Sequence, residues 1–212
     1  MTMEKCIVNP EIEEYLHKIT PERDAVLREM EALGDELDFP IVGPLVGRLL
    51  YTLTKCLGAR RILELGSGFG YSAYWFSMAL PASGRVVCTE SEKANADLAI
   101  SFFKKAGIED KIEYHIGDAL KEIDEIEGEF GIIFNDINKH QYPEAFRKAV
   151  PRLRKGGLFI SDNVLWSGRV LDEKPDASTA AIIEFTRLLY SSNKLFTTII
   201  PVRDGVSVSI KL

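Results

Sequence analysis

Two acidic residues and an amide follow apolar segments in the second half of the chain. Asp136 comes just after the apolar run 130–134, and Asp162 and Asn163 follow the run 158–161. If both runs are parallel strands, their carboxyl ends lie at one edge of a sheet, in the crevice where ligands bind. Carboxylate and amide oxygens there can hold a hard divalent cation such as Mg²⁺ or Ca²⁺. Two alternatives are that the three side chains cap helices, or that Asp136 is a general base without a metal.

A lysine lies close to Asp136 in the sequence. Lys139 is three residues further on, where the next helix is expected to begin. A lysine beside a metal-bound hydroxyl could take up its proton, which makes Lys139 a candidate general base. His140, the next residue, is the rival candidate. The alternative is that Lys139 is an ordinary solvated lysine on the surface.

A glycine-rich segment, residues 66–70, joins an apolar strand to a helix. Its spacing is G-x-G-x-G, and the acid Glu64 stands before it. Glycines at such a turn permit positive φ and let a ligand approach the backbone. Glu90 lies 20 residues beyond Gly70, at the end of the next strand, where a carboxylate can accept hydrogen bonds from both hydroxyls of a ribose. The pattern predicts a ligand that contains a nucleoside; a tight turn beside a solvated acid is the alternative.

The spacing of the glycines bears on which nucleoside is bound. The dinucleotide fingerprint is G-x-G-x-x-G, and position 71, where its last glycine would stand, is tyrosine. This difference disfavours a dehydrogenase that binds NAD at the glycine segment.

Alternating short strands and helices must position these groups. Strands are predicted at 61–65, 85–90, 111–116, 130–134, 158–161, 194–200 and 206–212. Helices are predicted at 41–57, from the glycine turn to Leu80, at 92–106, from Tyr142 to the pair Gly156-Gly157, and at 177–191. This alternation predicts a doubly wound α/β fold with a mostly parallel, seven-stranded sheet that ends in an antiparallel hairpin. Serines alternate with apolar residues in the last strand, so one of its faces is more polar.

The chain before residue 38 is predicted to be helical. Thr20 and Pro21 have the residue types of a helix N-cap and of a first helical position. Its apolar residues exceed what a minimal sheet core needs, so these helices could cover the active site or pair with another subunit. We therefore divide the chain into an N-terminal helical extension, 1–37, and a ligand-binding domain, 38–212.

Composition narrows the class of protein. The 212 residues include 26 Lys and Arg against 32 Asp and Glu, a formal net charge of −6 that disfavours non-specific binding of long nucleic acids. The three cysteines form no CxxC pair, which indicates a reducing compartment. No apolar run is long enough for a membrane span, and the N-terminus is acidic where a signal peptide is apolar. A cytoplasmic protein that does not bind membranes is expected.

Four segments of the chain occur in a recognisable order, namely Glu64–Ser72, Phe134–Tyr142, Gly156–Gly168 and Pro201–Gly205. Together they resemble the cation-dependent O-methyltransferases of the catechol and caffeoyl-CoA type. The glycine spacing resembles motif I of class I S-adenosylmethionine-dependent methyltransferases. The resemblance implies their Rossmann-like fold, S-adenosylmethionine as cofactor, and a divalent cation, with Mg²⁺ ahead of Ca²⁺ and Mn²⁺.

The resemblance also implies roles for single residues. Asp136, Asp162 and Asn163 match the family's metal ligands, Lys139 matches its general base, and Glu90 matches its ribose-binding acid. The other matches are to positions that contact the cofactor: Val42, Gly43, Glu64, Gly66, Gly68, Tyr71 and Ser72 around the methionine part and the glycine loop, Asp118 and Ala119 along the adenine, and Asp136 beside the metal. The family often has an apolar residue in place of Asn135, and Asp or Trp in place of Asn138.

The resemblance implies a small aromatic acceptor with a catechol-like vicinal diol, and a homodimer. Some relatives methylate a hydroxylated tRNA base, so a tRNA hydroxyuridine O-methyltransferase that uses the same site is the alternative. A non-catalytic cofactor-binding protein is disfavoured, because binding the cofactor alone requires no metal ligands.

Overall fold

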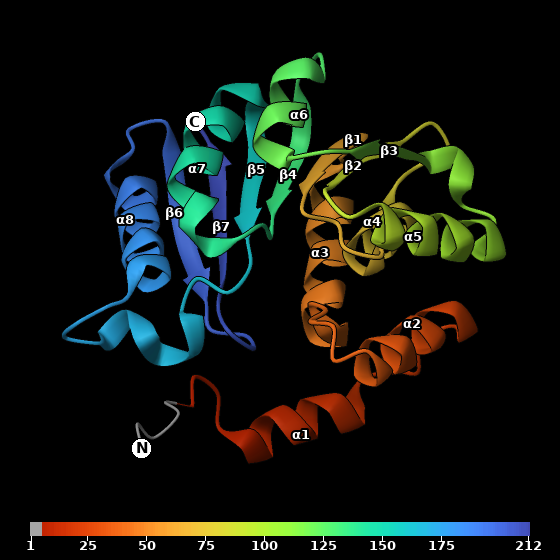
Figure 1. Cartoon of the computed structure of the whole chain (residues 1–212), viewed down its shortest axis with the longest axis horizontal. Helices are drawn as coiled ribbons and strands as arrows, with labels where there is room; N and C mark the ends of the chain where they lie inside the picture. Colours follow the sequence, from red (N-terminus) through yellow and green to blue (C-terminus); the bar gives the residue numbers. More distant parts are fainter. Residues whose placement is uncertain (1–5) are drawn as a thin grey trace.

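The computed structural model describes residues 6–212, and within them seven strands form one sheet in the order β3-β2-β1-β4-β5-β7-β6 (Figure 1). The strands are β1 (Arg61–Leu65), β2 (Arg85–Glu90), β3 (Ile112–Ile116), β4 (Phe130–Asn135), β5 (Leu153–Ser161), β6 (Leu195–Ile200) and β7 (Val206–Lys211). The first five strands pair in parallel, and β7 is antiparallel to both β5 and β6. The doubly wound sheet with a closing hairpin is therefore confirmed.

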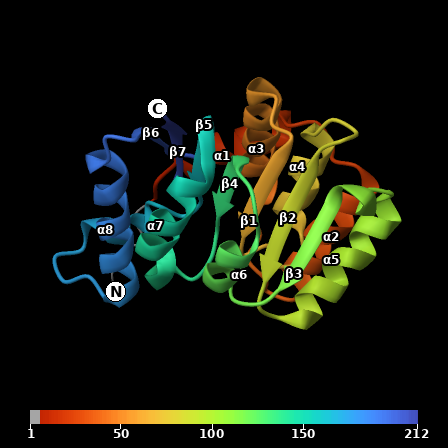
Figure 2. The same cartoon turned by 90° about the horizontal axis from the view of Figure 1, so that it is seen from above.

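Helices cover both faces of this sheet (Figure 2). One face packs against α2 (Ala25–Glu36), α3 (Gly43–Leu57), α4 (Tyr71–Ala79) and α5 (Lys93–Ala106). The other face packs against α6 (Ala119–Glu125), α7 (Tyr142–Arg152) and α8 (Ala177–Ser191). The remaining elements are α1 (Pro10–Ile19) and the 3₁₀ turns η1 (Glu109–Lys111), η2 (Lys139–Gln141) and η3 (Trp166–Leu171). Because helices cover both faces, successive strand residues such as Ile132 and Ile133 are both fully buried.

The predicted start of the N-terminal helix was wrong. Thr20 is the C-cap of α1, and its N–H donates to the Leu16 carbonyl oxygen. Pro21 disfavours the helical conformation in the residue before it, and Thr20 is accordingly extended, with ψ 123°. The N-cap of α2 is Asp24, whose carboxylate accepts two N–H groups of the first turn.

The predicted end of α7 at the glycine pair was also wrong. The helix ends at Arg152, and β5 begins at Leu153. Gly156 has φ 73°, and a Cβ on Gly157 would lie 2.9 Å from the Gly131 carbonyl oxygen. The two glycines therefore allow an irregular stretch of β5 to lie against β4; they do not end a helix.

The more polar face of β7 is the buried one. Ser207 and Ser209 are fully buried, whereas Ile210 on the opposite face is exposed. The Ser209 hydroxyl lies 2.9 Å from the Thr197 hydroxyl of β6, which also donates to the Leu189 carbonyl oxygen of α8. These small polar residues allow α8 to pack closely on the hairpin.

The two N-terminal helices differ in how they pack. Residues 1–5 of the predicted extension lie outside the described residues. Within the extension, α2 contributes Leu27 and Met30 to the same core as the sheet. In contrast, α1 has no buried residue and exposes Ile12, Tyr15 and Ile19 along one side. Among the helices that the structure describes, none has the length and apolar character required to cross a bilayer.

β1 carries a buried acid just before the glycine loop. The Glu64 carboxylate accepts a hydrogen bond from the Ser72 hydroxyl at the start of α4, and the Cys88 thiol lies 3.7 Å from its other oxygen. Burial disfavours the charged form and raises the pKa of Glu64 from 4.5 to about 7. The end of β1 and the beginning of α4 are thus joined through a carboxyl group that titrates near neutral pH.

This pKa shift predicts a pH dependence of stability. The folded state binds the Glu64 proton more tightly than the unfolded chain does, so its contribution to stability is complete below about pH 4.5 and is lost as the pH rises to about 7. Glu64→Gln is expected to remove up to about 3 kcal/mol of that loss. Urea unfolding of both proteins between pH 4.5 and 7.5 measures the difference, with the exposed Glu92→Gln as control. Parallel pH profiles for wild type and Glu64→Gln would contradict the shift.

Candidate active site

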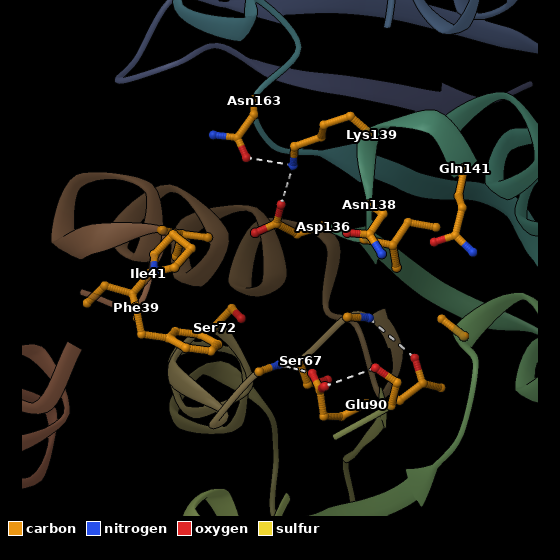
Figure 3. Close-up of a pocket in the computed structure, with 18 of the residues that line it drawn as sticks. Phe39, Ile41, Ser67, Ser72, Glu90, Asp136, Asn138, Lys139, Gln141 and Asn163 are labelled. Atoms are coloured by element: carbon orange, nitrogen blue, oxygen red, sulfur yellow. Dashed lines mark hydrogen bonds and ion pairs between the residues drawn. The ribbon is translucent and has the colours of Figure 1, made fainter. Parts of the chain in front are cut away.

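A cavity of about 650 Å³ opens at the carboxyl ends of the parallel strands. The loops that follow β1 to β5 line it, together with residues 39–42 before α3 (Figure 3). β1 and β4 are neighbours in the sheet although they are not consecutive in the chain. Their loops lead to helices on opposite faces, which leaves a crevice between them. The cavity therefore lies where the sequence predicted the ligand crevice.

The glycine loop passes very close to the residue that follows β4. Gly66 has φ 82°, and a Cβ there would lie 2.7 Å from the Asp136 carbonyl oxygen. Gly70 has φ 88°, and a Cβ there would lie 2.3 Å from the Phe103 ring. Both positions require glycine, because positive φ and the lack of space each exclude a side chain.

Glu90 is positioned by backbone N–H groups on both sides. The Gly68 N–H donates to Oε2 at 2.8 Å, and the Glu92 N–H donates to Oε1 at 2.9 Å. Figure 3 shows the carboxylate beside the glycine loop, on the cavity wall. An ionised carboxylate has about four acceptor sites, so Glu90 can still accept hydrogen bonds from a ligand diol.

Asp118 and Ala119 line the cavity after β3. One Asp118 oxygen caps α6 by accepting the Leu120 N–H at 2.9 Å, and the other accepts from Gln141 Nε2 at 3.3 Å. Gln141 was not predicted as a site residue, because nothing in its sequence context distinguishes it. It links the loop after β3 to the loop after β4.

Most residues predicted to contact the cofactor line the cavity: Val42, Gly66, Gly68, Tyr71, Ser72, Glu90, Asp118, Ala119 and Asp136. Two do not. Gly43 begins α3 with φ 71°, behind Val42, and Glu64 lies beneath the loop, bonded to Ser72. Gly43 can therefore affect a ligand only through Val42, and Glu64 only through Ser72.

Lys139 lies at the centre of the predicted metal cluster. Its Nζ donates to Asp136 Oδ1, to Asn163 Oδ1 and to the Tyr142 hydroxyl, each at 2.8 Å, and Figure 3 draws the first two contacts. Only 12% of its side chain is exposed. Lys139 is thus an interior group of the cluster and differs from the solvated lysine of the alternative.

Asp162, the third predicted cation ligand, is fully buried and does not line the cavity. Its Oδ1 accepts no hydrogen bond within the described part of the chain, and its Oδ2 lies 3.5 Å from Arg203 Nη1. Burial, and after it the charge of Asp136, raise the pKa of Asp162 from 3.8 to about 7, against the opposing effect of Arg203. Two neighbouring carboxylates therefore repel each other, and one buried oxygen has no partner.

This donor set fits a divalent cation. Two carboxylates and the Asn163 amide oxygen are hard ligands, and the unpartnered Asp162 oxygen is available to a cation. The ammonium group of Lys139 already bridges Asp136 and Asn163, which shows that positive charge is favoured between them. The helix-cap alternative receives no support, because the N-caps of the described helices that follow are Asn138, Gln141 and Leu165.

Strained backbone surrounds the same end of the cavity. Positive φ values near 50° occur at Asn163, Trp166, Ser167 and Arg203, none of which is glycine. The Ser167 N–H donates to Asp204 Oδ1 at 2.5 Å, which joins the loop after β5 to the β6–β7 turn. Strain of this kind persists where the surrounding structure requires a particular arrangement, as at functional sites.

The segment before α3 forms a further wall of the cavity, which no sequence motif predicts. Phe39 and Ile41 line the cavity near Ser72 (Figure 3), and the Phe39 ring lies 4.9 Å from the Phe69 ring. These residues are apolar and lie in no motif, so only the folded structure places them at the site. Arg203 also lines the cavity; it belongs to the segment Pro201–Gly205, but the sequence predicts no role for it.

A polar contact ties α2 to the glycine loop. The Tyr71 hydroxyl donates to Glu31 Oε1 at 2.7 Å. The Arg23 guanidinium binds the same carboxylate through Nε, at 2.9 Å, and through Nη2. Burial and then this hydrogen bond raise the pKa of Tyr71 well above its usual value, so the phenol remains the donor.

Comparison with known proteins agrees with this geometry. A sequence model of the family described as O-methyltransferase matches residues 17–212. A catechol O-methyltransferase of Niastella koreensis is 31% identical over 201 residues, which are 89% of this chain and 90% of that protein. A caffeoyl-CoA O-methyltransferase of Eucalyptus globulus is 29% identical over 76% of this chain and 71% of its own length.

A solved structure shares the fold over the whole chain. The O-methyltransferase TomG of Streptomyces achromogenes, in complex with S-adenosylmethionine, superposes with a TM-score of 0.88 at 30% identity, over 100% of this chain and 99% of that one. The family match spans far more than half of the chain, so the resemblance noted in the sequence is confirmed. The chain belongs to the O-methyltransferase family and is an S-adenosylmethionine-dependent O-methyltransferase.

Proposed function

We propose that this enzyme methylates one hydroxyl of a vicinal diol on a small aromatic acceptor, with the help of a divalent cation. The observation that carries the proposal is the cluster in which Lys139 Nζ lies 2.8 Å from both Asp136 Oδ1 and Asn163 Oδ1. The glycine loop and Glu90 lie across the same cavity (Figure 3), so cofactor and acceptor would meet between them. The relative named as a catechol O-methyltransferase supports this acceptor class.

The cofactor is proposed to lie along the wall formed by the loops after β1, β2 and β3. Glu90 would bind the ribose hydroxyls, and Asp118 and Ala119 would lie beside the adenine. Val42 and Ser72 would face the methionine part, near the cation cluster. The related TomG structure, which is a complex with S-adenosylmethionine, supports this molecule as the cofactor.

Asp136, Asp162 and Asn163 would hold the cation, with Mg²⁺ ahead of Ca²⁺ and Mn²⁺. When bound, such a cation supplies Lewis-acid stabilisation of an ionised acceptor hydroxyl. The three side chains contribute oxygen atoms alone, which matches the preference of these hard cations. Tyr142 helps to position Asp162, because its hydroxyl donates a hydrogen bond to the Asp162 carbonyl oxygen at 3.0 Å.

Lys139 is the proposed general base, and Tyr142 and Asn163 hold its nitrogen in place. As the uncharged amine, with the cation supplying the positive charge between Asp136 and Asn163, it would accept the proton of the acceptor hydroxyl. The acceptor oxygen then bonds to the methyl carbon as the carbon–sulfur bond breaks, and the electron pair stays on sulfur to give S-adenosylhomocysteine. Because the sulfonium methyl is already activated, alignment of the reactants contributes most of the rate gain.

Assembly and location are further parts of the proposal. The exposed residues Ile12, Tyr15 and Ile19 form an apolar stripe on α1, which a second copy of the chain would cover in a homodimer. The three cysteines are unpaired in the structure, which supports a reducing compartment such as the cytoplasm.

Removal of divalent cations is expected to lower methyl transfer to a catechol by at least about 100-fold, because the ionised hydroxyl loses its counter-charge. Labelled S-adenosylmethionine is incubated with catechol, with phenol, with a caffeoyl thioester or with hydroxylated tRNA, each with Mg²⁺ or with EDTA. Chelation predicts turnover of the diols and little of phenol. Full turnover in EDTA would contradict the cation's role, and methylation of tRNA without any of catechols would establish the tRNA alternative.

Lys139→Met is expected to lower kcat by about 10²–10⁴-fold, because the acceptor hydroxyl loses its base. The affinity for S-adenosylhomocysteine, measured by calorimetry, should stay within a few-fold of wild type. The matched control is His140→Gln, which changes the neighbouring rival base and should retain most activity. Wild-type rates for Lys139→Met at every pH would disprove the assignment.

The homodimer predicts a species of about 48 kDa in sedimentation, twice the 23.8 kDa of one chain. Replacing both Ile12 and Ile19 by Lys should shift the protein to the monomer, because charge on the stripe opposes its burial. Leu171→Lys, which alters an exposed leucine outside α1, should leave the dimer intact. A monomeric wild-type protein would refute the assembly.

A further inference from the structure

Arg203 lies in the β6–β7 turn, where two cavities meet. It lines the main cavity, and it also lines a neighbouring cavity of about 340 Å³. The second cavity is bounded by residues 6–8, by Glu13 of α1, by Asn163 and Ser167 after β5, and by Asp204. A substituent on an acceptor bound at the Lys139 cluster would therefore reach Arg203 before it reached the second cavity.

The backbone of Arg203 is in an unfavourable conformation for its residue type. Its φ is 52°, in the left-handed region where glycine is the residue without strain. Gly205, two residues further on, also has a positive φ of 82°, but as a glycine it adopts this conformation without strain. An arginine held in a strained turn on a cavity wall indicates that its side chain has a role there.

The guanidinium group is only weakly engaged by the protein. Among the described residues its one hydrogen bond is to Asp162 Oδ2, at 3.5 Å from Nη1. Its other carboxylate neighbour, Asp204, already accepts the Ser167 N–H at 2.5 Å. An arginine has five N–H donors in a planar arrangement, two of which can bind the two oxygens of one carboxylate. Most of the Arg203 donors remain available for such a ligand.

The other cationic side chain on the same wall is committed elsewhere. Lys139 donates to Asp136, Asn163 and Tyr142 when it is charged, and as the uncharged amine of the proposed base it would offer no charge to an anion. Arg203 is 36% exposed in its side chain and carries a permanent charge. It is therefore the group at this end of the cavity that is best suited to bind an anion.

We propose that Arg203 determines acceptor specificity by binding an anionic substituent, the carboxylate of a small dihydroxybenzoate-type acid. This inference rests on the proposed function, because it names the acceptor class of the same site. Arg203 lies close to Asp162, a proposed ligand of the cation that would bind the diol. This closeness favours an anion that is attached directly to the aromatic ring. The phosphates of a coenzyme A thioester present similar chemistry, but they lie many bonds away from the ring.

The test compares acceptors that share one ring and differ in charge. The 2,3- and 3,4-dihydroxybenzoates, catechol, dopamine and caffeoyl-CoA are assayed with wild type, Arg203→Gln and Arg203→Lys. Wild type should prefer one of the dihydroxybenzoates to catechol by about tenfold or more in kcat/KM, mainly through KM. Arg203→Gln should remove most of this ratio, and Arg203→Lys should keep part of it, because the charge remains without the planar fork. The ratio cancels any general loss of activity in the variants.

A matched control and a binding measurement complete the test. Arg169→Gln removes an arginine whose guanidinium lies 5.7 Å from the Trp166 ring but which lines neither cavity, and it should leave the ratio unchanged. Calorimetry with Mg²⁺ and S-adenosylhomocysteine present should show the same preference in Kd, independent of turnover. An unchanged Kd ratio in Arg203→Gln, or an effect confined to caffeoyl-CoA, would overturn the proposal. Failure of every diol to be methylated would instead count against the proposed function, and the Kd ratios would still decide the role of Arg203.

Discussion

The negative charge of the carboxylates at the ends of β4 and β5 must be balanced by positive charge. The positions of the cationic side chains around the site follow from this requirement. Asp136 and Asp162 follow adjacent strands, which lie about 5 Å apart, so the sheet itself brings the carboxylates together. Water cannot solvate Asp162, which is fully buried. Lys139 reaches the pair from η2, and Arg203 reaches it from the β6–β7 turn. The C-terminal hairpin, whose strands are the antiparallel part of the sheet, thus contributes a charge to the site.

The sequence predicted those parts of the site that depend on residue type and on position at a strand end. The glycines, Glu90 and the residues after β4 and β5 could be found because strand ends converge and because each chemistry requires particular residue types. Thr20 and the Gly156-Gly157 pair were misjudged because the same residue types serve more than one purpose. Thr20 ends a helix instead of beginning one, and the glycines permit close contact between strands. Only the pairing of β5 with β4 distinguishes the second case.

Other parts could not be predicted because they depend on contacts between distant segments. Glu31 on α2 accepts a hydrogen bond from Tyr71, which is 40 residues away in the chain. Neither residue carries a sequence signal for this contact, since an acid on an amphipathic helix is normally solvated. The contact makes α2 a support of the glycine loop, whereas α1 adds no buried residue to the core.

The close approach of Gly66 to Asp136 has a consequence for how this protein can change. A Cβ at position 66 would meet the backbone of the residue that carries a proposed cation ligand. The loop that would hold the methyl donor and the strand end that would hold the acceptor are therefore in direct contact, without an intervening side chain. Substitutions that enlarge one half of the cavity will displace the other half. New acceptor preferences should accordingly evolve at the periphery of the cavity, in residues 39–42 and the β6–β7 turn, where the two halves can be varied separately.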